Sequence, residues 1–370
     1  MLQYPLRMKL SASSLINRRQ ERTEEIVTVN IQTLMDLGWS DFYAQQIASD
    51  EADQIVPMRI STVHRVNMNA LAEDGAHTLL PQVHQSTGDF AVGDWVLADP
   101  KTGQVLRTLE RKSVLKRYAS GSDSRSQLIA ANIDTLFIVT SCNDDFKVEW
   151  IDLFLALAHD AEVYPVVVLT KTDTVHNPND WISRAKALSP SLEVIGLDTA
   201  DALQLTRLEE WCQSGKTVAM VGSSGVGKST LLNELSGLSQ ATGELSSKVV
   251  QGRHTTTTRS LHRVKAGGWI IDTPGIRGLR LYDGARGIDS LFNDVADLAN
   301  QCHFRDCSHE NEPGCAIQAA ISNGTIDIER FNRWQKLHQN GLQLQKRSHE
   351  ATPSLGDQKR KKKPTQKKRR

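Results

Sequence analysis

The residues best suited to chemistry form a glycine-rich loop that reads GSSGVGKST and spans residues 222–230. It matches the pattern G-x-x-x-x-G-K-[ST] and lies between KTVAMVG, a strand-like apolar run, and STLLNELSG, a helical sequence. In such a loop the backbone amides face the phosphates of a nucleotide, the lysine neutralises them, and the next hydroxyl binds Mg²⁺. The predicted nucleotide-binding residues are Gly222, Ser223, Ser224, Gly225, Val226, Gly227, Lys228, Ser229 and Thr230, with Lys228 also catalytic and Ser229 the Mg²⁺ ligand.

A second motif, Asp272-Thr273-Pro274-Gly275, follows the strand-like sequence WIID. An acidic residue at a strand end, followed by a glycine, is how phosphate-loop proteins reach Mg²⁺ and sense the γ-phosphate. We therefore predict that Asp272 acts on Mg²⁺, directly or through water, and that the Gly275 amide faces the γ-phosphate. The segment 252–259, GRHTTTTR, lies between the two motifs and would supply a second hydroxyl for Mg²⁺, for which Thr256 and Thr257 are the candidates.

The four residues Thr170, Lys171, Thr172 and Asp173 follow another apolar run, VYPVVVLT, and resemble the guanine-specificity motif N-K-x-D. A carboxylate at the Asp173 position can accept both the N1 and the N2 protons of guanine and meets no such pair on adenine. Thr170 stands where the motif has Asn, which weakens the expected contact near guanine N7 and the bracing of the loop. We predict guanine as the base. In the competing hypothesis, an ATP-using phosphate-loop enzyme, Asp173 has no part in reading the base.

The order of these motifs departs from that of ordinary GTPases, in which the phosphate loop comes first and the base-reading motif comes late. Here residues 170–173 precede the phosphate loop, the threonine-rich segment and residues 272–275. The order predicts a circularly permuted domain with an unchanged parallel sheet. It also predicts that the D-x-P-G segment leads almost directly into the C-terminal domain.

Three cysteines and two histidines gather at residues 302–315 in the pattern C-x4-C-x-H-x5-C. Three thiolates and one imidazole make a closed tetrahedral site, which is typical of structural zinc. We predict the ligands Cys302, Cys307, His309 and Cys315. His303 is the competing imidazole, but it adjoins Cys302 and would leave His309 unexplained.

The chain has 370 residues, 39% hydrophobic and 24% charged, which predicts a soluble protein of several domains without a membrane span. The predicted fold is multidomain: an OB-like β-barrel, a central α/β phosphate-loop GTPase domain and a small α-helical zinc domain. Short β-prone segments and a following basic group (Arg107, Arg111, Lys112, Lys116 and Arg117) suggest a barrel that binds RNA, although a solvated strand face explains them as well. The predicted parts are an extension (1–54), a barrel (55–122), a GTPase domain (123–285), a zinc domain (286–345) and a basic tail (346–370).

The net charge of +1 conceals a strongly basic end. Residues 345–370 hold eleven Lys or Arg against Glu350 and Asp357, which gives +9 and leaves −8 for the rest. Such a run of like charges predicts a disordered tail whose natural partners are polyanions such as RNA. The N-terminus has no apolar stretch long enough for export, so we expect a cytoplasmic location.

Together these motifs resemble one family, the circularly permuted, ribosome small-subunit-dependent GTPase A. The resemblance covers roughly residues 60–340 and is carried by the following sequences: GDWV (93–96), AANIDTLFIV (130–139), GSSGVGKSTLLN (222–233), GRHTTTTR (252–259), DTPGIR (272–277) and CHFRDCSHENEPGCA (302–316). It implies a monomeric GTPase that uses GTP with Mg²⁺, carries one structural Zn²⁺, and binds the small ribosomal subunit and its rRNA to assist late maturation. The departures are Thr170, the long N-terminal extension and the basic tail.

The residue after D-x-P-G is Ile276, where Ras-type enzymes place a glutamine that orients water. Because an aliphatic side chain cannot do this, we predict slow intrinsic hydrolysis that needs help from elsewhere, and the resemblance implies that the small subunit stimulates it. By resemblance His254 is the internal candidate for the catalytic water-positioning group, although it could instead only order its loop. Besides the ATP-using enzyme, a passive RNA-binding scaffold with a vestigial nucleotide site is the remaining alternative.

Overall fold

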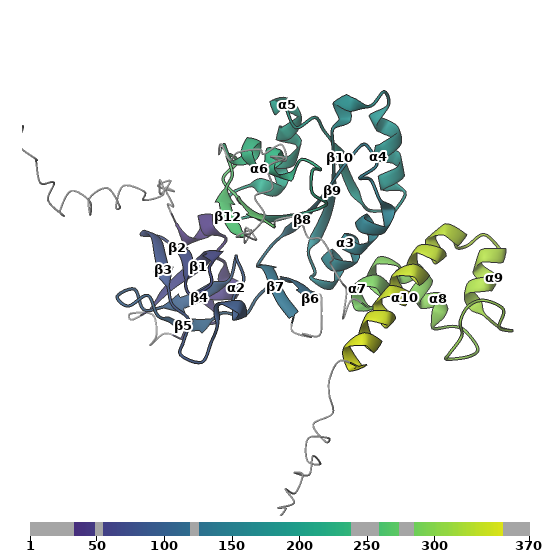
Figure 1. Cartoon of the computed structure of the whole chain (residues 1–370), viewed down its shortest axis with the longest axis horizontal. Helices are drawn as coiled ribbons and strands as arrows, with labels where there is room; N and C mark the ends of the chain where they lie inside the picture. Colours follow the sequence, from purple (N-terminus) through teal and green to yellow (C-terminus); the bar gives the residue numbers. More distant parts are fainter. Residues whose placement is uncertain (1–32, 49–54, 119–125, 238–258, 274–284, 351–370) are drawn as a thin grey trace, which may run out of the picture.

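The structure is a computed structural model of the whole chain, and it describes residues 33–48, 55–118, 126–237, 259–273 and 285–350. A β-rich region, an α/β region and a helical region follow one another along the molecule (Figure 1). Within the described residues no helix is long and apolar enough to cross a membrane.

The β-rich region consists of short antiparallel strands, as the turn signals predicted. They are β1 (Val56–Val63), β2 (Met68–Ala72), β3 (Gly75–Leu79), β4 (Trp95–Ala98) and β5 (Val105–Thr108), with a 3-10 turn η2 (Thr87–Asp89) before β4. β1 pairs with both β2 and β4, which in turn pair with β3 and β5. These strands enclose a small apolar core that includes Met58, Ile60 and Val96. We call this region the barrel; its identity as an oligonucleotide-binding barrel stays a prediction.

Two shorter pieces adjoin the barrel. The N-terminal segment forms a 3-10 turn η1 (Leu34–Leu37) and a one-turn helix α2 (Asp41–Ala44). The strands β6 (Val114–Tyr118) and β7 (Ser126–Ala131) form a separate hairpin across the boundary expected at residues 122 and 123. Where one domain ends and the next begins therefore stays a prediction.

The central α/β region is built on a parallel sheet, as the apolar runs predicted. Its strands in spatial order are β10 (Glu193–Gly196), β9 (Tyr164–Thr170), β8 (Thr135–Ser141), β11 (Thr217–Val221) and β13 (Trp269–Asp272). Every residue of β8 and β11 is buried, because helices cover both faces of the sheet. One edge continues through β12 (Ser260–Arg263), which is antiparallel to β13 and meets β1 of the barrel at the pair Thr62–Ser260.

Alternating residues of β8 identify the helices on each face. Leu136 and Ile138 share one core with α3 (Val148–Asp160) and α4 (Pro178–Lys186). Phe137 and Val139 share the other core with α5 (Ala202–Leu205), the 3-10 helix η4 (Thr206–Cys212) and α6 (Lys228–Ser236). A further 3-10 turn, η3 (Thr172–Thr174), follows β9.

The helical region contains α7 (Ala285–Leu291), α8 (Asn293–Ala299), α9 (Ala316–Ser322) and α10 (Ile328–Glu350). Gly287 lies so close to α3 that an added Cβ would stand 2.1 Å from the Ala156 carbonyl oxygen. The Arg333 guanidinium of α10 also donates to the buried Asp152 carboxylate of α3, with an Nη2–Oδ1 distance of 2.5 Å. The helical region is thus held directly against the α/β region, at the end away from the barrel (Figure 1).

Candidate functional site: a nucleotide pocket and a metal cluster

The phosphate-loop motif forms the turn between β11 and α6. Gly222 has φ 146° and an ideal Cβ there would lie 2.1 Å from the Val139 carbonyl oxygen, so only glycine fits. Gly227, with φ 97°, precedes the first residue of α6, so the loop amides and the helix N-terminus converge. This is the arrangement that binds phosphates through backbone amides.

Lys228 lies over the loop and is only 8% exposed. Its Nζ donates to the carbonyl oxygens of Gly222 at 2.9 Å and Ser223 at 2.6 Å. Burial lowers the pKa of Lys228, while the nearby Asp272 carboxylate opposes that change. The ammonium thus makes its hydrogen bonds to two neutral carbonyls, with the Asp272 carboxylate nearby, and the phosphates of a nucleotide would add anionic hydrogen-bond acceptors.

Asp272 ends β13, the strand beside the phosphate-loop strand. Burial raises the pKa of Asp272, whereas His262 and Lys228 lower it. The next residue, Thr273, is 1% exposed and its hydroxyl donates to the Met220 carbonyl oxygen of β11. The described part of the motif, Asp272 and Thr273, is therefore fixed to the strand that carries the loop, and the charges of Asp272 and Lys228 interact.

The base-reading motif meets the phosphate loop directly. Thr170, at the end of β9, is fully buried, and its hydroxyl lies 2.6 Å from the Val226 carbonyl oxygen of the loop and 3.1 Å from the Thr140 carbonyl oxygen. The loop-bracing contact that seemed weakened without Asn is thus made by the threonine hydroxyl. Lys171 then adopts left-handed backbone (φ 59°), and the exposed Asp173 follows in η3.

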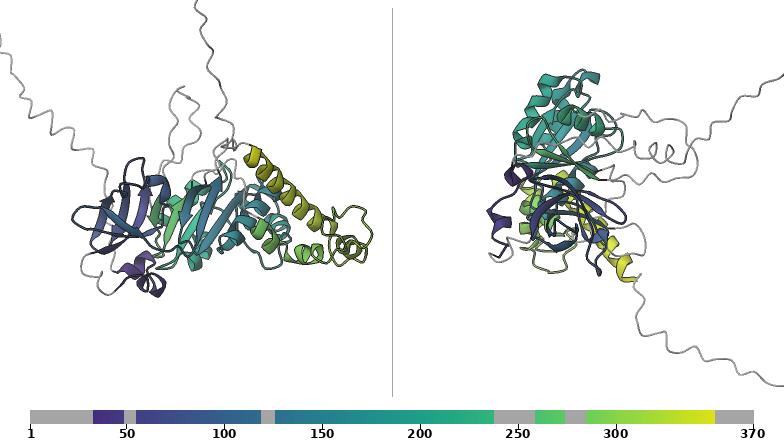
Figure 2. Two further views of the ribbon diagram at one scale, coloured as in Figure 1. Left: turned by 90° about the horizontal axis from the view of Figure 1, so that it is seen from below. Right: turned by 90° about the vertical axis from the view of Figure 1, so that its left-hand side faces the viewer.

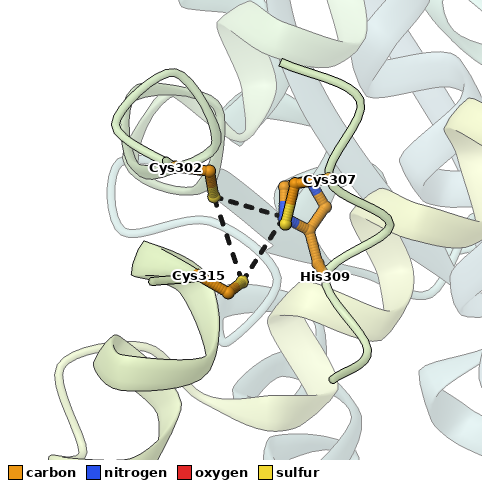
Figure 3. Close-up of side chains that lie close together, drawn as sticks. All are labelled: Cys302, Cys307, His309 and Cys315. Atoms are coloured by element: carbon orange, nitrogen blue, oxygen red, sulfur yellow. Dashed lines mark hydrogen bonds between the residues drawn. The ribbon is translucent and has the colours of Figure 1, made fainter. Parts of the chain in front are cut away.

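The four metal-ligand candidates also converge (Figure 3). The donor atoms of Cys302, Cys307, His309 and Cys315 all lie within 4.8 Å of one another. The Cys302 and Cys315 sulfurs are 3.9 Å apart, and His309 Nδ1 lies 3.5 and 3.7 Å from them. A tetrahedral zinc ion with bonds of about 2.0–2.3 Å separates its ligands by roughly 3.5–3.8 Å, so the donors fit this ion.

The surrounding residues hold these ligands in place. The Glu312 carboxylate accepts hydrogen bonds from the Ser308 hydroxyl and from the backbone amides of Ser308, Glu310 and Asn311, which folds the loop. The bonds from the Ser308 hydroxyl and from the Ser308 and Glu310 amides lower the pKa of Glu312 to about 2. His309 packs beside the rings of Phe331 and Trp334 of α10. His303 does not join the cluster and instead lies against Phe304, so the structure favours His309 as the imidazole.

Comparison with known proteins agrees with this geometry. Residues 108–282 match the model of the RsgA GTPase family. The chain is 47% identical over 317 residues to "Small ribosomal subunit biogenesis GTPase RsgA" from Mesorhizobium japonicum, which covers 85% of this chain and 91% of that protein. The chain belongs to the RsgA GTPase family. It is therefore a GTP-hydrolysing enzyme of the phosphate-loop class.

Other members and solved structures agree. "Small ribosomal subunit biogenesis GTPase RsgA 2" from Vibrio parahaemolyticus is 45% identical, covering 82% of this chain and 84% of that protein. YjeQ from Thermotoga maritima has a TM-score of 0.56 at 25% identity, covering 78% of this chain and 99% of that one. YloQ, described as a circularly permuted GTPase, has a TM-score of 0.55 at 21% identity over 83% and 99% of the two chains. The permuted fold predicted from the motif order is thereby confirmed.

Several predicted site residues cannot be placed. His254, Thr256, Thr257 and Gly275 lie outside the described residues, as does the basic tail from residue 351. The nucleotide and metal roles assigned to the individual residues stay predictions, although Thr170, the phosphate loop, Lys228 and Asp272 are neighbours.

The structure also shows residues near the site that the sequence did not single out. Ser260 of β12 lies directly opposite Asp272, and its hydroxyl is 2.7 Å from Nε2 of His262, two residues along the same strand. A lone histidine in a polar segment gives no signal of this kind, because the strand register that places Ser260 opposite Asp272 and His262 opposite Ile270 cannot be read from the sequence.

Replacing Thr170 tests the contact between the two motifs. We expect Thr170→Val to lower GTP affinity about 5- to 30-fold, because a buried hydrogen bond worth about 1–2 kcal/mol is lost and the Val226 carbonyl is left without its donor. Thr170→Ser keeps the hydroxyl and is the matched control. Binding of a fluorescent GTP analogue measures the effect, and equal affinities for the two variants would contradict the bracing role.

Proposed function

We propose that this chain is a GTPase of small ribosomal subunit biogenesis that binds the subunit through rRNA and is stimulated by it. The observation that carries the proposal is the contact of Thr170 with Val226, which brings a guanine motif to an intact phosphate loop. The subunit is inferred from the names of two relatives that are 45% and 47% identical to this chain over most of their length.

The geometry supports a division of roles in the nucleotide pocket. The amides of residues 222–227 bind the phosphates, the Lys228 ammonium neutralises them, and Asp173 accepts the guanine N1 and N2 protons. Mg²⁺, when bound, supplies positive charge that stabilises the transferring phosphoryl group. Ser229 and Asp272 would hold it, together with Thr256 or Thr257, while the Gly275 amide faces the γ-phosphate.

His254 is proposed as the group that positions the attacking water, since Ile276 cannot. We expect His254→Ala to reduce subunit-stimulated turnover about 10²- to 10³-fold while GTP affinity changes little, because positioning acts on the transition state. Turnover and nucleotide binding are measured on the same preparation. If the variant retained full stimulated turnover, the histidine would only order its loop.

Three of the five cations in the predicted basic group, Arg107, Arg111 and Lys112, make contacts within the protein. Arg111 forms an ion pair with the buried Asp94 (Nε–Oδ1 2.6 Å), and Arg107 donates to the Gln46 carbonyl oxygen at 2.9 Å. Lys112 donates to the Ser40 hydroxyl and lies over the Tyr43 ring. Because these cations serve internal contacts, we propose that the basic tail and the exposed loop around Arg65 carry more of the RNA binding.

The decisive experiment measures GTP turnover with and without small subunits, for the full chain and a chain truncated at residue 345. We expect stimulation in the full chain and weaker association after truncation. Raising the salt concentration should weaken the association of the full chain with small subunits more steeply than that of the truncated chain, because the truncated chain lacks the nine net positive charges of the tail. A full chain whose turnover did not respond to small subunits, or that preferred ATP, would overturn the proposal.

A single zinc ion is proposed at the Cys302, Cys307, His309 and Cys315 cluster. We expect Cys302→Ser to lower the zinc content from about one per chain to near zero and to unfold the helical region, because small metal domains depend on the metal for folding. Metal analysis and thermal unfolding measure both effects. Cys212→Ser, at a buried cysteine outside the cluster, is the control and should keep its zinc.

A further inference from the structure

The N-terminal segment of residues 33–48, which we call the strap, connects the barrel to the α/β region (Figure 2, purple). On the barrel side, the Leu34 amide donates to Glu73 at 3.2 Å, and the Gln46 side chain accepts from the Glu110 amide at 2.7 Å. On the other side, Asp36 accepts from the Ser214 hydroxyl at 2.7 Å and, through its carbonyl, from the Trp269 indole at 2.6 Å. The strap therefore bonds to both regions at once.

Apolar packing makes the strap part of the core. Leu37 and Tyr43 are 0% and 2% exposed. Trp39 and Tyr43 pack on Trp95 of β4, with ring centroids 4.8 and 5.7 Å apart. Aromatic pairs of this kind add about 0.5–1.5 kcal/mol each beyond their buried area, so the strap does not detach without a substantial cost.

Arg59 of β1 lies beneath the strap and is 1% exposed. Its guanidinium donates to the Leu37 carbonyl of the strap, to the Asn132 carbonyl before β8 at 3.1 Å, and to the Thr217 hydroxyl of β11 at 2.8 Å. Burial lowers its pKa to about 10, so it remains charged at neutral pH.

No acidic side chain forms an ion pair with Arg59 in the described part of the chain, and its Nε has no partner. Asp134 and Asp94 lie near enough to raise the pKa of Arg59, but neither forms an ion pair with it. Burying such a charge is costly, and a hydrophobic residue of similar size would often be at least as stabilising. Stability alone therefore does not explain an arginine here. What the guanidinium provides is simultaneous hydrogen bonding to three separate segments.

Two residues that are hydrogen-bonded to Arg59 or the strap begin strands that end at the nucleotide pocket. Thr217 begins β11, whose other end runs into Gly222 and the phosphate loop. Trp269, bonded to the strap, begins β13, whose last residue is Asp272. Thr217 and Trp269 are partners in the parallel register, so the strap and Arg59 hold the starts of both strands that end at the phosphates.

We propose that Arg59 and the strap form a clamp that transmits binding on the barrel to the phosphate-loop strand. A hollow of about 390 Å³, lined by Trp39, Arg59 and Thr217 among others, adjoins the clamp. The clamp rests on the proposed function in one respect only: the partner on the barrel is the small subunit. Arg59 is accordingly a positioning residue that acts through β11.

The test compares Arg59→Met and Thr217→Val with the intact chain in two measurements. The first is the ratio of turnover with small subunits to turnover without them. This ratio should fall about tenfold in Arg59→Met, while turnover without subunits stays within about threefold of that of the intact chain. A tenfold change lies within the usual range of coupling between two sites. The second, which needs no ribosome, is hydrogen exchange of residues 33–48 with and without GDP. We expect GDP to slow this exchange in the intact chain and to leave it unchanged in Arg59→Met.

Thr135→Val is the matched control, because Thr135 begins the neighbouring strand β8 and makes no bond to Arg59. It should behave as the intact chain does. If Arg59→Met does not fold, Thr217→Val decides, with a smaller loss in the same direction. The clamp is refuted if the folded variants keep the intact ratio and exchange response, or if Thr135→Val loses them equally. An intact chain that small subunits do not stimulate would refute the proposed function, while hydrogen exchange would still decide the clamp.

Discussion

Asp173→Asn is expected to lower GTP affinity about 10²- to 10⁴-fold, because both hydrogen bonds lose their charged acceptor, an effect of about 1.5–3 kcal/mol each, and one of them is replaced by two opposed donors. An amide can accept only one of the two guanine protons and presents a donor to the other. Xanthine carries an oxygen where guanine has its amino group, so the same amide can donate to it. We therefore expect the variant to gain affinity for xanthosine triphosphate as it loses affinity for GTP.

Competition binding with GTP, ATP and xanthosine triphosphate measures this change. Asp180→Asn is a suitable control, because it is the same substitution at a residue outside the motif, in the first turn of α4. If Asp173→Asn bound GTP as tightly as the intact chain, Asp173 would not read the base. Tighter binding of ATP than GTP in the intact chain would contradict the guanine assignment altogether.

Lys228→Ala should not lower the melting temperature of the nucleotide-free enzyme, but it should strongly lower the affinity for GTP. In the absence of nucleotide the buried ammonium is poorly solvated, as the lowered pKa of Lys228 indicates, so its removal should leave the melting temperature unchanged or higher. In the presence of GTP the lost charge-assisted contacts to phosphate, about 3–6 kcal/mol for two, should reduce affinity about 10²- to 10⁴-fold.

Thermal melting with and without GTP and Mg²⁺ separates the two effects. The intact chain should be stabilised by GTP, because a ligand that binds only the folded state raises its stability. The variant should show little of this stabilisation at the same concentration. Lys186→Ala, at an exposed lysine of α4, should retain it. A variant that GTP stabilised fully would mean that Lys228 does not contact the phosphates.

Much of this molecule could be predicted from local sequence. The apolar runs of β8, β9 and β11 identified a parallel sheet, since such strands are buried on both faces. The order of three short motifs identified the permutation, because side chains at the carboxyl ends of neighbouring parallel strands share one edge wherever they fall in the sequence. The cluster of Cys302, Cys307, His309 and Cys315, which could hold a metal ion, was recognisable from spacing, because all four residues come from one loop and its flanks.

The features that escaped prediction depend on contacts between distant residues. The weight placed on Asn at position 170 was excessive, since a hydroxyl reaches the Val226 carbonyl as well. The sequence offered an RNA-binding group or a solvated strand face for Arg107, Arg111 and Lys112, and could not show that each also contacts a group within the protein. Arg59 gives no signal in the sequence, because its three acceptors lie 22, 73 and 158 residues away.

The pairing of β1 with β12 also constrains how the protein is made. Thr62 finds its partner at Ser260, so the two strands are separated by 198 positions in the chain. At a synthesis rate of roughly 5–20 residues per second, β1 is complete about 10–40 seconds before β12 is. During that interval the end of β1 around Thr62 lacks its β12 partner, although β4 covers Val56–Arg59 of the same strand, and an uncovered strand edge is a template for pairing with other chains. Slow translation or crowded nascent chains should therefore favour aggregation at this edge, and early coverage of it by a chaperone would raise the yield of folded enzyme.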